Sequence, residues 1–243
     1  PTVAYVHSHY LMCPGYALFL RRSSRVCPFA ASLRCLVNAQ VEHCCFGLNP
    51  KRHLDRLWQV RRLLNATSDV QVLVGSAFMR QRLISNGLAP ERISLLAPVL
   101  FSESVAEYTP PLDPGSILFV GRIIYEKGLR NLIQALVGVQ GDWRLVVAGD
   151  GPDRQACEQL VAQLQIAERV EFKGWLTPDE VQTLYQRSAV VALPSLWPEP
   201  YGRVGPEAFV SGRPVVGYAV GGIPDWLEDG ETGYLASPCD IGS

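Results

Sequence analysis

Long apolar runs and a starting methionine are both missing from this chain of 243 residues. No stretch of 18 consecutive apolar residues occurs, so the sequence contains no recognisable membrane-spanning helix. The first residues, Pro-Thr-Val-Ala-Tyr-Val, have the pattern of a β-strand rather than of a secretory signal. We therefore expect a cytoplasmic protein, and a fragment whose true beginning is missing.

Cys-x-x-Cys spacings are also missing, although five of the seven cysteines lie within the first 45 residues. Structural zinc sites commonly use such spacings, and cytosolic thiols are reduced by default. Reduced thiols are therefore favoured. A metal or redox cluster, with His9 or His43 as a further ligand, stays open as the alternative. The cysteines concerned are Cys13, Cys27, Cys35, Cys44 and Cys45.

Several enzyme signatures are absent. The chain has no Walker A ending, no serine-nucleophile elbow and no kinase signature. Residues 149–154, Gly-Asp-Gly-Pro-Asp-Arg, approach a dinucleotide fingerprint, but Arg154 stands where a small residue should allow close helix packing. We therefore reject a nicotinamide site and interpret this segment as a tight turn beside a ligand crevice.

The charge is divided unevenly along the chain. Residues 1–100 carry 12 lysines and arginines against 4 acidic residues, whereas residues 101–243 carry 10 against 19. A basic half favours anionic partners, although solvated surface arginines explain it equally well. Residues 51–65 read as a basic amphipathic helix that either lies on a membrane or packs its apolar face on a core. No aromatic-interleaved basic motif supports nucleic-acid binding.

Short apolar runs alternate with helix-compatible segments along most of the chain. After residue 116 the expected strands are 117–120, 144–148, 170–172, 190–193 and 215–218, and the expected helices are 129–137, 154–164, 178–187, 206–211 and 223–228. Before it we expect strands 3–6, 70–74 and 93–96, helices 51–65 and 76–85, and an irregular stretch over 13–50. This alternation favours an α/β fold with a parallel, doubly wound sheet.

Charged residues follow the ends of two expected strands. Gly121 and Arg122 come directly after one strand, and Lys127 precedes the next helix, so together they could bind a diphosphate. A surface loop is the alternative. Glu199 follows another strand and Glu207 stands eight positions later in a helix-compatible stretch, so both could face the crevice at the strand ends.

Two further features lie at expected strand ends. Residues 221–222 are a Gly-Gly pair that could present backbone N–H groups to a ligand or could form a simple flexible turn. His7 ends the first expected strand. A lone histidine more often has a structural role, but this position favours function.

Five motifs in a fixed order give the chain a family resemblance. They are Phe-Val-Gly-Arg-Ile-Ile-Tyr-Glu-Lys-Gly, Val-Val-Ala-Gly-Asp-Gly-Pro, Phe-Lys-Gly-Trp-Leu, the Glu199/Glu207 pair, and Gly-Arg-Pro-Val-Val-Gly-Tyr-Ala-Val-Gly-Gly-Ile-Pro-Asp. The chain resembles family-4 retaining glycosyltransferases of the GT-B fold, well over residues 68–240 and more loosely before them. The resemblance implies two Rossmann-like domains facing a crevice, the first incomplete and the second nearly complete.

The resemblance also implies roles for individual residues. Arg122 and Lys127 would bind the diphosphate and stabilise the leaving group, beside Gly121. Glu207 would hold the ribose, Glu199 the donor sugar near its reacting carbon, and His7 would face sugar and acceptor. Backbone near the base and near the sugar and phosphate completes the set: Trp175 and Leu176 for the base, and Tyr201, Gly202, Arg203 and Val204 for the sugar and phosphate.

The resemblance places the acceptor-side domain at residues 1–101, a linker at 102–115 and the donor-binding domain at 116–243. The implied reaction moves a hexose from a nucleoside-diphosphate sugar to an acceptor hydroxyl with retention, without a bound metal, in bacterial polysaccharide or glycolipid synthesis. The acceptor would be a carbohydrate or lipid-linked, and residues 1–100 could contact an anionic membrane at the inner face of the cell membrane. A sugar-nucleotide epimerase or hydrolase, or a non-catalytic nucleotide-binding fragment, stays open.

Overall fold

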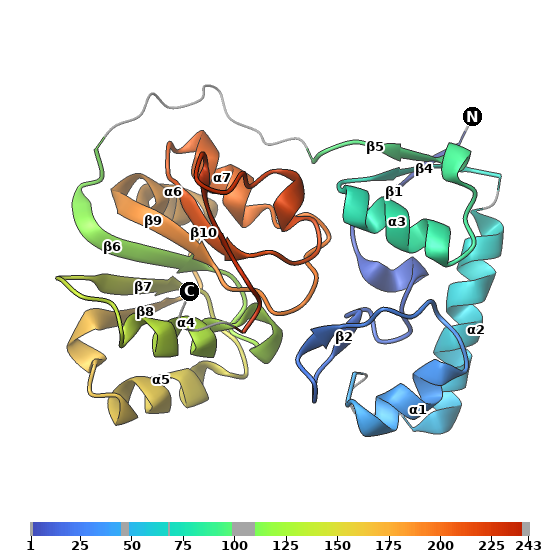
Figure 1. Cartoon of the computed structure of the whole chain (residues 1–243), viewed down its shortest axis with the longest axis horizontal. Coiled ribbons are helices and arrows are strands. Elements are labelled where there is room, and N and C mark those ends of the chain that lie inside the picture. Colours follow the sequence, from blue (N-terminus) through green and yellow to red (C-terminus); the bar gives the residue numbers. More distant parts are fainter. Residues whose placement is uncertain (1, 45–48, 68, 99–109, 240–243) are drawn as a thin grey trace. The chain divides into compact units, whose positions relative to one another are not determined.

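The computed structural model describes residues 2–44, 49–67, 69–98 and 110–239 (Figure 1). The chain forms two compact units. Unit 1 comprises Pro1–Pro98, Trp197–Tyr201 and Val220–Asp225, and unit 2 comprises Val99–Leu196, Gly202–Ala219 and Trp226–Ser243. Residues 102–109 of the predicted linker lie outside the described residues.

A small parallel sheet forms the centre of unit 1. Its strands β1 (Val3–Val6), β4 (Gln71–Val74) and β5 (Ile93–Leu95) lie in the order β1-β4-β5, and both pairings are parallel. Helices α2 (Pro50–Ala66) and α3 (Ala77–Ser85) and the 3₁₀ turns η1 (His9–Leu11) and η2 (Pro90–Arg92) complete the framework. The three predicted strands and two predicted helices are therefore present.

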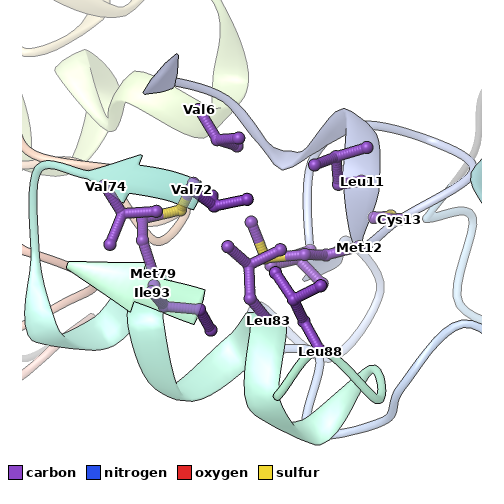
Figure 2. Close-up of a cluster of buried hydrophobic side chains, with 11 residues drawn as sticks. Val6, Leu11, Met12, Cys13, Val72, Val74, Met79, Leu83, Leu88 and Ile93 are labelled. Carbon is purple, nitrogen blue, oxygen red and sulfur yellow. The ribbon is translucent and has the colours of Figure 1, made fainter. Parts of the chain in front are cut away.

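The core of unit 1 follows from strand and helix periodicity. Val72 and Val74 alternate inward on β4, while Met79 and Leu83, four residues apart on α3, share one buried face. Figure 2 shows these side chains with Leu11, Met12 and Leu88 from neighbouring turns. Each such side chain contributes roughly 1.5–3 kcal/mol when fully buried, which holds the β-strand ends in place.

Residues 13–50, predicted to be irregular, contain more order than expected. They form an antiparallel pair, β2 (Phe19–Leu20) with β3 (Arg25–Val26), and the helix α1 (Arg34–Val41). The prediction was wrong for α1 because its apolar residues do not mark one buried face. Val37 and Val41 are exposed, and Ala39 is the buried residue of this helix.

Helix α2 packs against the core of unit 1 through only part of its apolar surface. Asn49 accepts a hydrogen bond from the Arg52 N–H at 2.8 Å and so caps the helix. The buried positions on α2 are His53, Leu57 and Val60. Leu54 and Trp58, apolar residues of the same helix, are 44% and 61% exposed, because they lie one helical position beyond the buried row.

Unit 2 is built on a six-stranded, wholly parallel sheet in the order β11-β10-β9-β6-β7-β8. The strands are β6 (Asp113–Val120), β7 (Arg144–Ala148), β8 (Val170–Gly174), β9 (Ser188–Leu193), β10 (Val215–Tyr218) and β11 (Gly233–Ala236). The chain builds outward from β6 to β8 and then returns to β9 beside β6. This reversal is a topological switch point, outside which ligands bind at the carboxyl ends of the strands.

The helices of unit 2 lie between these strands. They are α4 (Leu129–Leu136), α5 (Arg154–Gln163), α6 (Pro178–Arg187) and α7 (Val204–Val210), with the 3₁₀ turns η3 (Tyr125–Lys127), η4 (Ala167–Arg169) and η5 (Ile223–Asp225), of which η5 is counted in unit 1. In Figure 1, α4 and α5 lie on one side of the sheet and α6 and α7 on the other. This arrangement confirms the predicted doubly wound α/β fold.

The largest differences from prediction in the second half concern β6, η5 and β11. β6 begins at Asp113, within the range predicted as linker, and pairs Asp113 with Ser188 of β9. The helix predicted over 223–228 is only the 3₁₀ turn η5, and the edge strand β11 had no prediction. Edge elements of this kind depend on pairing with β10, which periodicity does not reveal.

Candidate functional site

Unit 2 contains a pocket of about 630 Å³ at the carboxyl ends of its strands. The residues lining it come from the loops after β6, β7 and β8 and from the facing sides of α6 and α7. They are Val120, Gly121, Arg122, Ala148, Gly149, Trp175, Leu176, Pro178, Val181, Gln182, Tyr185, Arg203, Glu207 and Val210. The pocket therefore lies at the edge of the sheet where the topology predicts a ligand.

Two glycines let neighbouring loops approach closely at the base of this pocket. Gly121 and Gly149 have φ values of 150° and 149°. A Cβ atom on Gly149 would lie 1.9 Å from the Gly121 carbonyl oxygen. The loops are fixed by hydrogen bonds from the Gly121 N–H to the Ala148 oxygen at 3.0 Å and from the Gly149 N–H to the Gly174 oxygen at 2.8 Å. The predicted tight turn thus lies at the pocket.

The cationic side of the site follows β6. Arg122 is exposed and lines the pocket, whereas Lys127 lies in η3, outside the lining residues. Gly128 takes a left-handed conformation with φ of 69°, and a Cβ there would lie 1.8 Å from the Pro194 oxygen. The Leu196 N–H also donates to the Glu126 oxygen at 2.9 Å. The loop after β9 and the turn carrying Lys127 are therefore fixed together.

The carboxylate of Glu207 also belongs to this pocket. It extends from α7, and 34% of its side chain is exposed. Arg203 lies 3.3 Å from its Oε1 atom, and the Tyr185 hydroxyl donates to its Oε2 atom at 3.3 Å. Burial, with the neighbouring Glu207 carboxylate, raises the pKa of Tyr185, so this hydroxyl stays protonated and acts as a donor.

An apolar surface forms the third side of the pocket. Trp175 follows β8 and is 78% exposed, so its ring is available at the rim. The start of α6 beside it is fixed by a capping box, in which Thr177 and Glu180 bond reciprocally to each other's backbone N–H. This side carries the apolar lining residues Leu176, Pro178, Val181 and Val210. The exposed Trp175 ring and these apolar side chains suit a ring system.

Glu199 and Tyr201, by contrast, belong to unit 1. Glu199 is buried, with 5% of its surface exposed, and its carbonyl oxygen accepts from the Gly222 N–H at 2.8 Å. The Ser76 hydroxyl, at the N-cap of α3, donates a hydrogen bond to the Pro200 carbonyl oxygen and so ties this segment to the start of that helix. Gly221 has a φ of 59°, and a Cβ there would lie 2.2 Å from the Glu199 oxygen. The Gly-Gly turn is therefore a packing requirement of this loop.

Two histidines near the end of β1 differ sharply. His7, the predicted functional histidine, is exposed and lies edge-on to the Tyr10 ring at 6.5 Å. His9 is fully buried, edge-on to the Trp197 ring at 5.4 Å, and its Nδ1 lies 3.3 Å from the Tyr16 oxygen. Burial lowers the pKa of His9 to about 4, against the smaller opposing effects of Tyr16 and Glu199. His9 is therefore neutral at physiological pH.

The structure thus assembles part of the predicted site. Six predicted residues line one pocket: Gly121, Arg122, Trp175, Leu176, Arg203 and Glu207. Gly202 and Val204 adjoin Arg203 at the start of α7. Sequence reasoning missed Tyr185 and Gln182 of α6, because a helical tyrosine reads as an ordinary core residue. It also missed the buried state of His9.

In the cysteine stretch Cys13 and Cys27 are buried, whereas Cys35 and Cys44 are half-buried. Burial raises the pKa of Cys13 and Cys35, and it raises the pKa of Cys27 to about 11. No group of three or more His, Cys, Asp or Glu side chains among the described residues is arranged to hold a metal ion. Cys45, which the metal alternative included, lies outside the described residues.

Across the parts of the chain that the structure describes, no helix has both the length and the apolar character needed to cross a bilayer.

A doubly wound parallel sheet with a pocket outside its switch point defines an α/β protein of the ligand-binding class. Residues 101–243 match the family model described as glycosyl transferases group 1, which covers more than half of the chain. The chain therefore belongs to the glycosyl transferases group 1 family. Its structural neighbours are GT-B glycosyltransferases, which confirms the predicted fold class.

Individual relatives show the same likeness. The chain is 32% identical to 2-deoxystreptamine glucosyltransferase of Streptomyces kanamyceticus, over 76% of this chain and 50% of that protein. It is 30% identical to D-inositol 3-phosphate glycosyltransferase of Mycobacterium sp. (strain JLS), over 98% and 56%. Anabaena HepE in complex with UDP-glucose superposes with a TM-score of 0.67 at 21% identity, over 85% and 63%. The chain thus spans about half the length of the curated relatives it matches.

Proposed function

We propose that this chain is a family-4 retaining glycosyltransferase that moves a hexose from a nucleoside-diphosphate sugar to an acceptor hydroxyl. One observation carries the proposal: a single pocket combines the Arg122 cation, the Glu207 carboxylate and an apolar side that ends at Trp175. These three surfaces match the chemistry of a diphosphate, a ribose and a base. The relatives of the chain, a glucosyltransferase among them, support the same reaction class.

Each group has a defined part in this reaction. Arg122 and Lys127 bind the diphosphate and stabilise the negative charge that develops on the leaving group, so the transfer needs no bound metal. Glu207 holds the ribose hydroxyls. Glu199 lies near the reacting carbon of the donor sugar, and His7 faces the acceptor.

The backbone completes donor binding in this proposal. Trp175 and Leu176 border the base, and the segment carrying Tyr201, Gly202, Arg203 and Val204 contacts the sugar and phosphate. Solved structures of Anabaena HepE contain UDP-glucose, or UDP with glucose, which supports a nucleotide sugar as donor. The acceptor is a carbohydrate or a lipid-linked sugar in bacterial polysaccharide or glycolipid synthesis.

Transfer of label from a panel of radiolabelled nucleoside-diphosphate sugars to sugar acceptors tests the proposal. We expect Glu207→Gln and Lys127→Ala each to lower kcat/KM by about 100-fold or more, because each removes a group that holds or neutralises the diphosphate donor. Glu231→Gln and Lys173→Ala are matched controls. Glu231 is exposed, and Lys173 pairs with Glu171 at 2.6 Å on β8, outside the pocket lining. Wild-type turnover in both Glu207→Gln and Lys127→Ala would refute the assignment.

Product analysis separates the alternatives. Retention is confirmed if NMR shows that the new glycosidic bond keeps the anomeric configuration of the donor. Free nucleotide with an epimerised or hydrolysed sugar would indicate an epimerase or hydrolase instead. Diphosphate binding by calorimetry without any turnover would indicate a nucleotide-binding protein.

We further propose that α2 docks unit 1 on an anionic lipid surface at the inner face of the cell membrane. Trp58 is 61% exposed beside the exposed Leu54, and Arg62 lies over the Trp58 ring at 5.3 Å. Arg61 adds a further exposed cation on this helix. Exposed apolar residues flanked by arginines are complementary to an anionic headgroup layer. Sedimentation with vesicles that contain phosphatidylglycerol, compared with phosphatidylcholine vesicles, tests the docking, and equal binding to both would refute it.

A further inference from the structure

Tyr185 is a buried residue whose one polar atom faces the candidate ribose-binding carboxylate. Its side chain is 2% exposed and extends from α6 toward α7. Its hydroxyl lies 3.3 Å from Glu207 Oε2 and 3.5 Å from the Val204 carbonyl oxygen. A single buried donor therefore faces both the carboxylate and the first turn of the helix that carries it.

Arg203 and Tyr185 both contact the Glu207 carboxylate, but they restrict its orientation to different degrees. Arg203, at 3.3 Å from Oε1, is 61% exposed, and an ion pair between solvated side chains restricts a carboxylate only weakly. The Tyr185 hydroxyl is enclosed, so its hydrogen bond to Oε2 has a fixed direction. An ionised carboxylate has about four acceptor sites, so it can keep this bond and still accept from sugar hydroxyls.

A separate link joins the same two helices without Tyr185. The Gln182 amide donates to the Ser211 hydroxyl at 3.0 Å, and the Ser211 hydroxyl donates to the Glu207 carbonyl oxygen at 3.3 Å. The ring of Tyr185 also fills its site irrespective of the hydroxyl. Replacing Tyr185 by Phe therefore removes one hydrogen-bond donor and leaves the packing of α6 against α7 in place.

We propose that Tyr185 is a positioning residue, whose hydroxyl holds the Glu207 carboxylate in the orientation that accepts hydrogen bonds from the ribose of the donor. The inference rests on the proposed function, in which Glu207 binds the ribose. It adds that the preference of the site for ribose over deoxyribose depends on α6. In this role the Tyr185 hydroxyl acts on the donor through the Glu207 carboxylate.

Calorimetric titration with nucleoside diphosphates tests this role. UDP, ADP and GDP are titrated with their 2′-deoxy counterparts, and the pair that binds wild type most tightly is used. We expect wild type to favour the ribonucleotide by about 10-fold or more, since a lost hydroxyl leaves the carboxylate without a partner. In Tyr185→Phe the affinity for the ribonucleotide falls by about 5- to 10-fold while that for the deoxynucleotide is unchanged, so the preference nearly disappears.

Two further variants separate positioning from a general structural effect. Tyr234→Phe, at a 65% exposed site on β11, is the matched control and should keep the wild-type preference. In a Glu207→Gln background, Tyr185→Phe should cause no further loss of preference. A purely structural role would weaken both nucleotides equally and lower the melting temperature without ligand.

The possible outcomes distinguish the inference from the proposed function. If Tyr185→Phe keeps the wild-type preference, the positioning role is refuted and the proposed function stands. If wild type binds a diphosphate without preferring ribose, the roles of both Glu207 and Tyr185 are refuted. If wild type binds none of the diphosphates, the proposed function itself fails.

Discussion

Replacing His9 should change how the stability of the protein depends on pH. His9 is fully buried between the Trp197 and Phe78 rings, and burial lowers its pKa from 6.5 to about 4. In the unfolded chain the same imidazole recovers an ordinary pKa of about 6.5. Between these two values the unfolded state binds a proton that the folded state does not. The free energy of unfolding therefore rises with pH between these two pKa values, and the contribution of His9 is fully present above them.

The size of the effect follows from these two pKa values. Proton linkage predicts that His9 alone lowers the free energy of unfolding by about 2 kcal/mol when the pH falls from 7 to 5. That is a large share of the 5–15 kcal/mol that typically stabilises a domain, by rough estimate. The carboxylates that titrate at still lower pH contribute to wild type and variant alike.

Urea unfolding at pH 5, 6 and 7, followed by circular dichroism and by tryptophan fluorescence, measures the effect. His9→Phe keeps an aromatic ring in the buried site but cannot bind a proton, so its stability should change less over this range by about 2 kcal/mol. His9→Gln provides a second variant without a titrating ring. His7→Gln, at an exposed site, should behave as wild type. Equal pH dependence in wild type and both His9 variants would show that His9 is not buried neutral.

Two other substitutions test the pocket and the docking surface. Gly149→Ala should lower stability by about 1–3 kcal/mol and abolish diphosphate binding, because its Cβ would meet the Gly121 oxygen at 1.9 Å and its φ is 149°. Gly138→Ala, where the nearest atom to the added Cβ lies at 3.7 Å, is the control. Equal melting temperatures for the two variants would contradict the close approach. Trp58→Ala should reduce sedimentation with phosphatidylglycerol vesicles several-fold, whereas Leu112→Ala, at a 71% exposed apolar site in unit 2, should not. An identical loss of sedimentation in both variants would argue against α2 as the membrane contact.

Much of unit 2 could be predicted because its signals are local. Helices such as α4 and α6 show a clear apolar period, and α6 carries a capping box at Thr177 and Glu180. Residues at the ends of parallel strands lie at one edge of a sheet, so the pocket positions of Arg122 and Glu207 followed from topology. These are consequences of periodicity and chain direction, which a single sequence contains.

The remainder depends on contacts between distant residues. The sequence does not reveal that His7 is exposed and His9 is buried, because the turn η1 places His9 inside the core. Tyr185 carries no mark that separates it from an apolar helix residue, since its hydroxyl acquires a partner only when α7 packs beside α6. Helix α1 was missed because its exposed Val37 and Val41 obscure the buried side.

Unit 1 is assembled from three separate stretches of chain, and this limits how the protein can be dissected. Cutting the chain between Pro98 and Trp197 would separate Val220 and Ile223, which are buried residues of unit 1, from the rest of that unit. The family match over residues 101–243 would therefore be an unsuitable boundary for expressing that portion alone. A polypeptide of residues 101–243 alone would expose Val220, Ile223 and Pro198 to water and would tend to aggregate. The two units should therefore be expressed together on one polypeptide, although each has a sheet of its own.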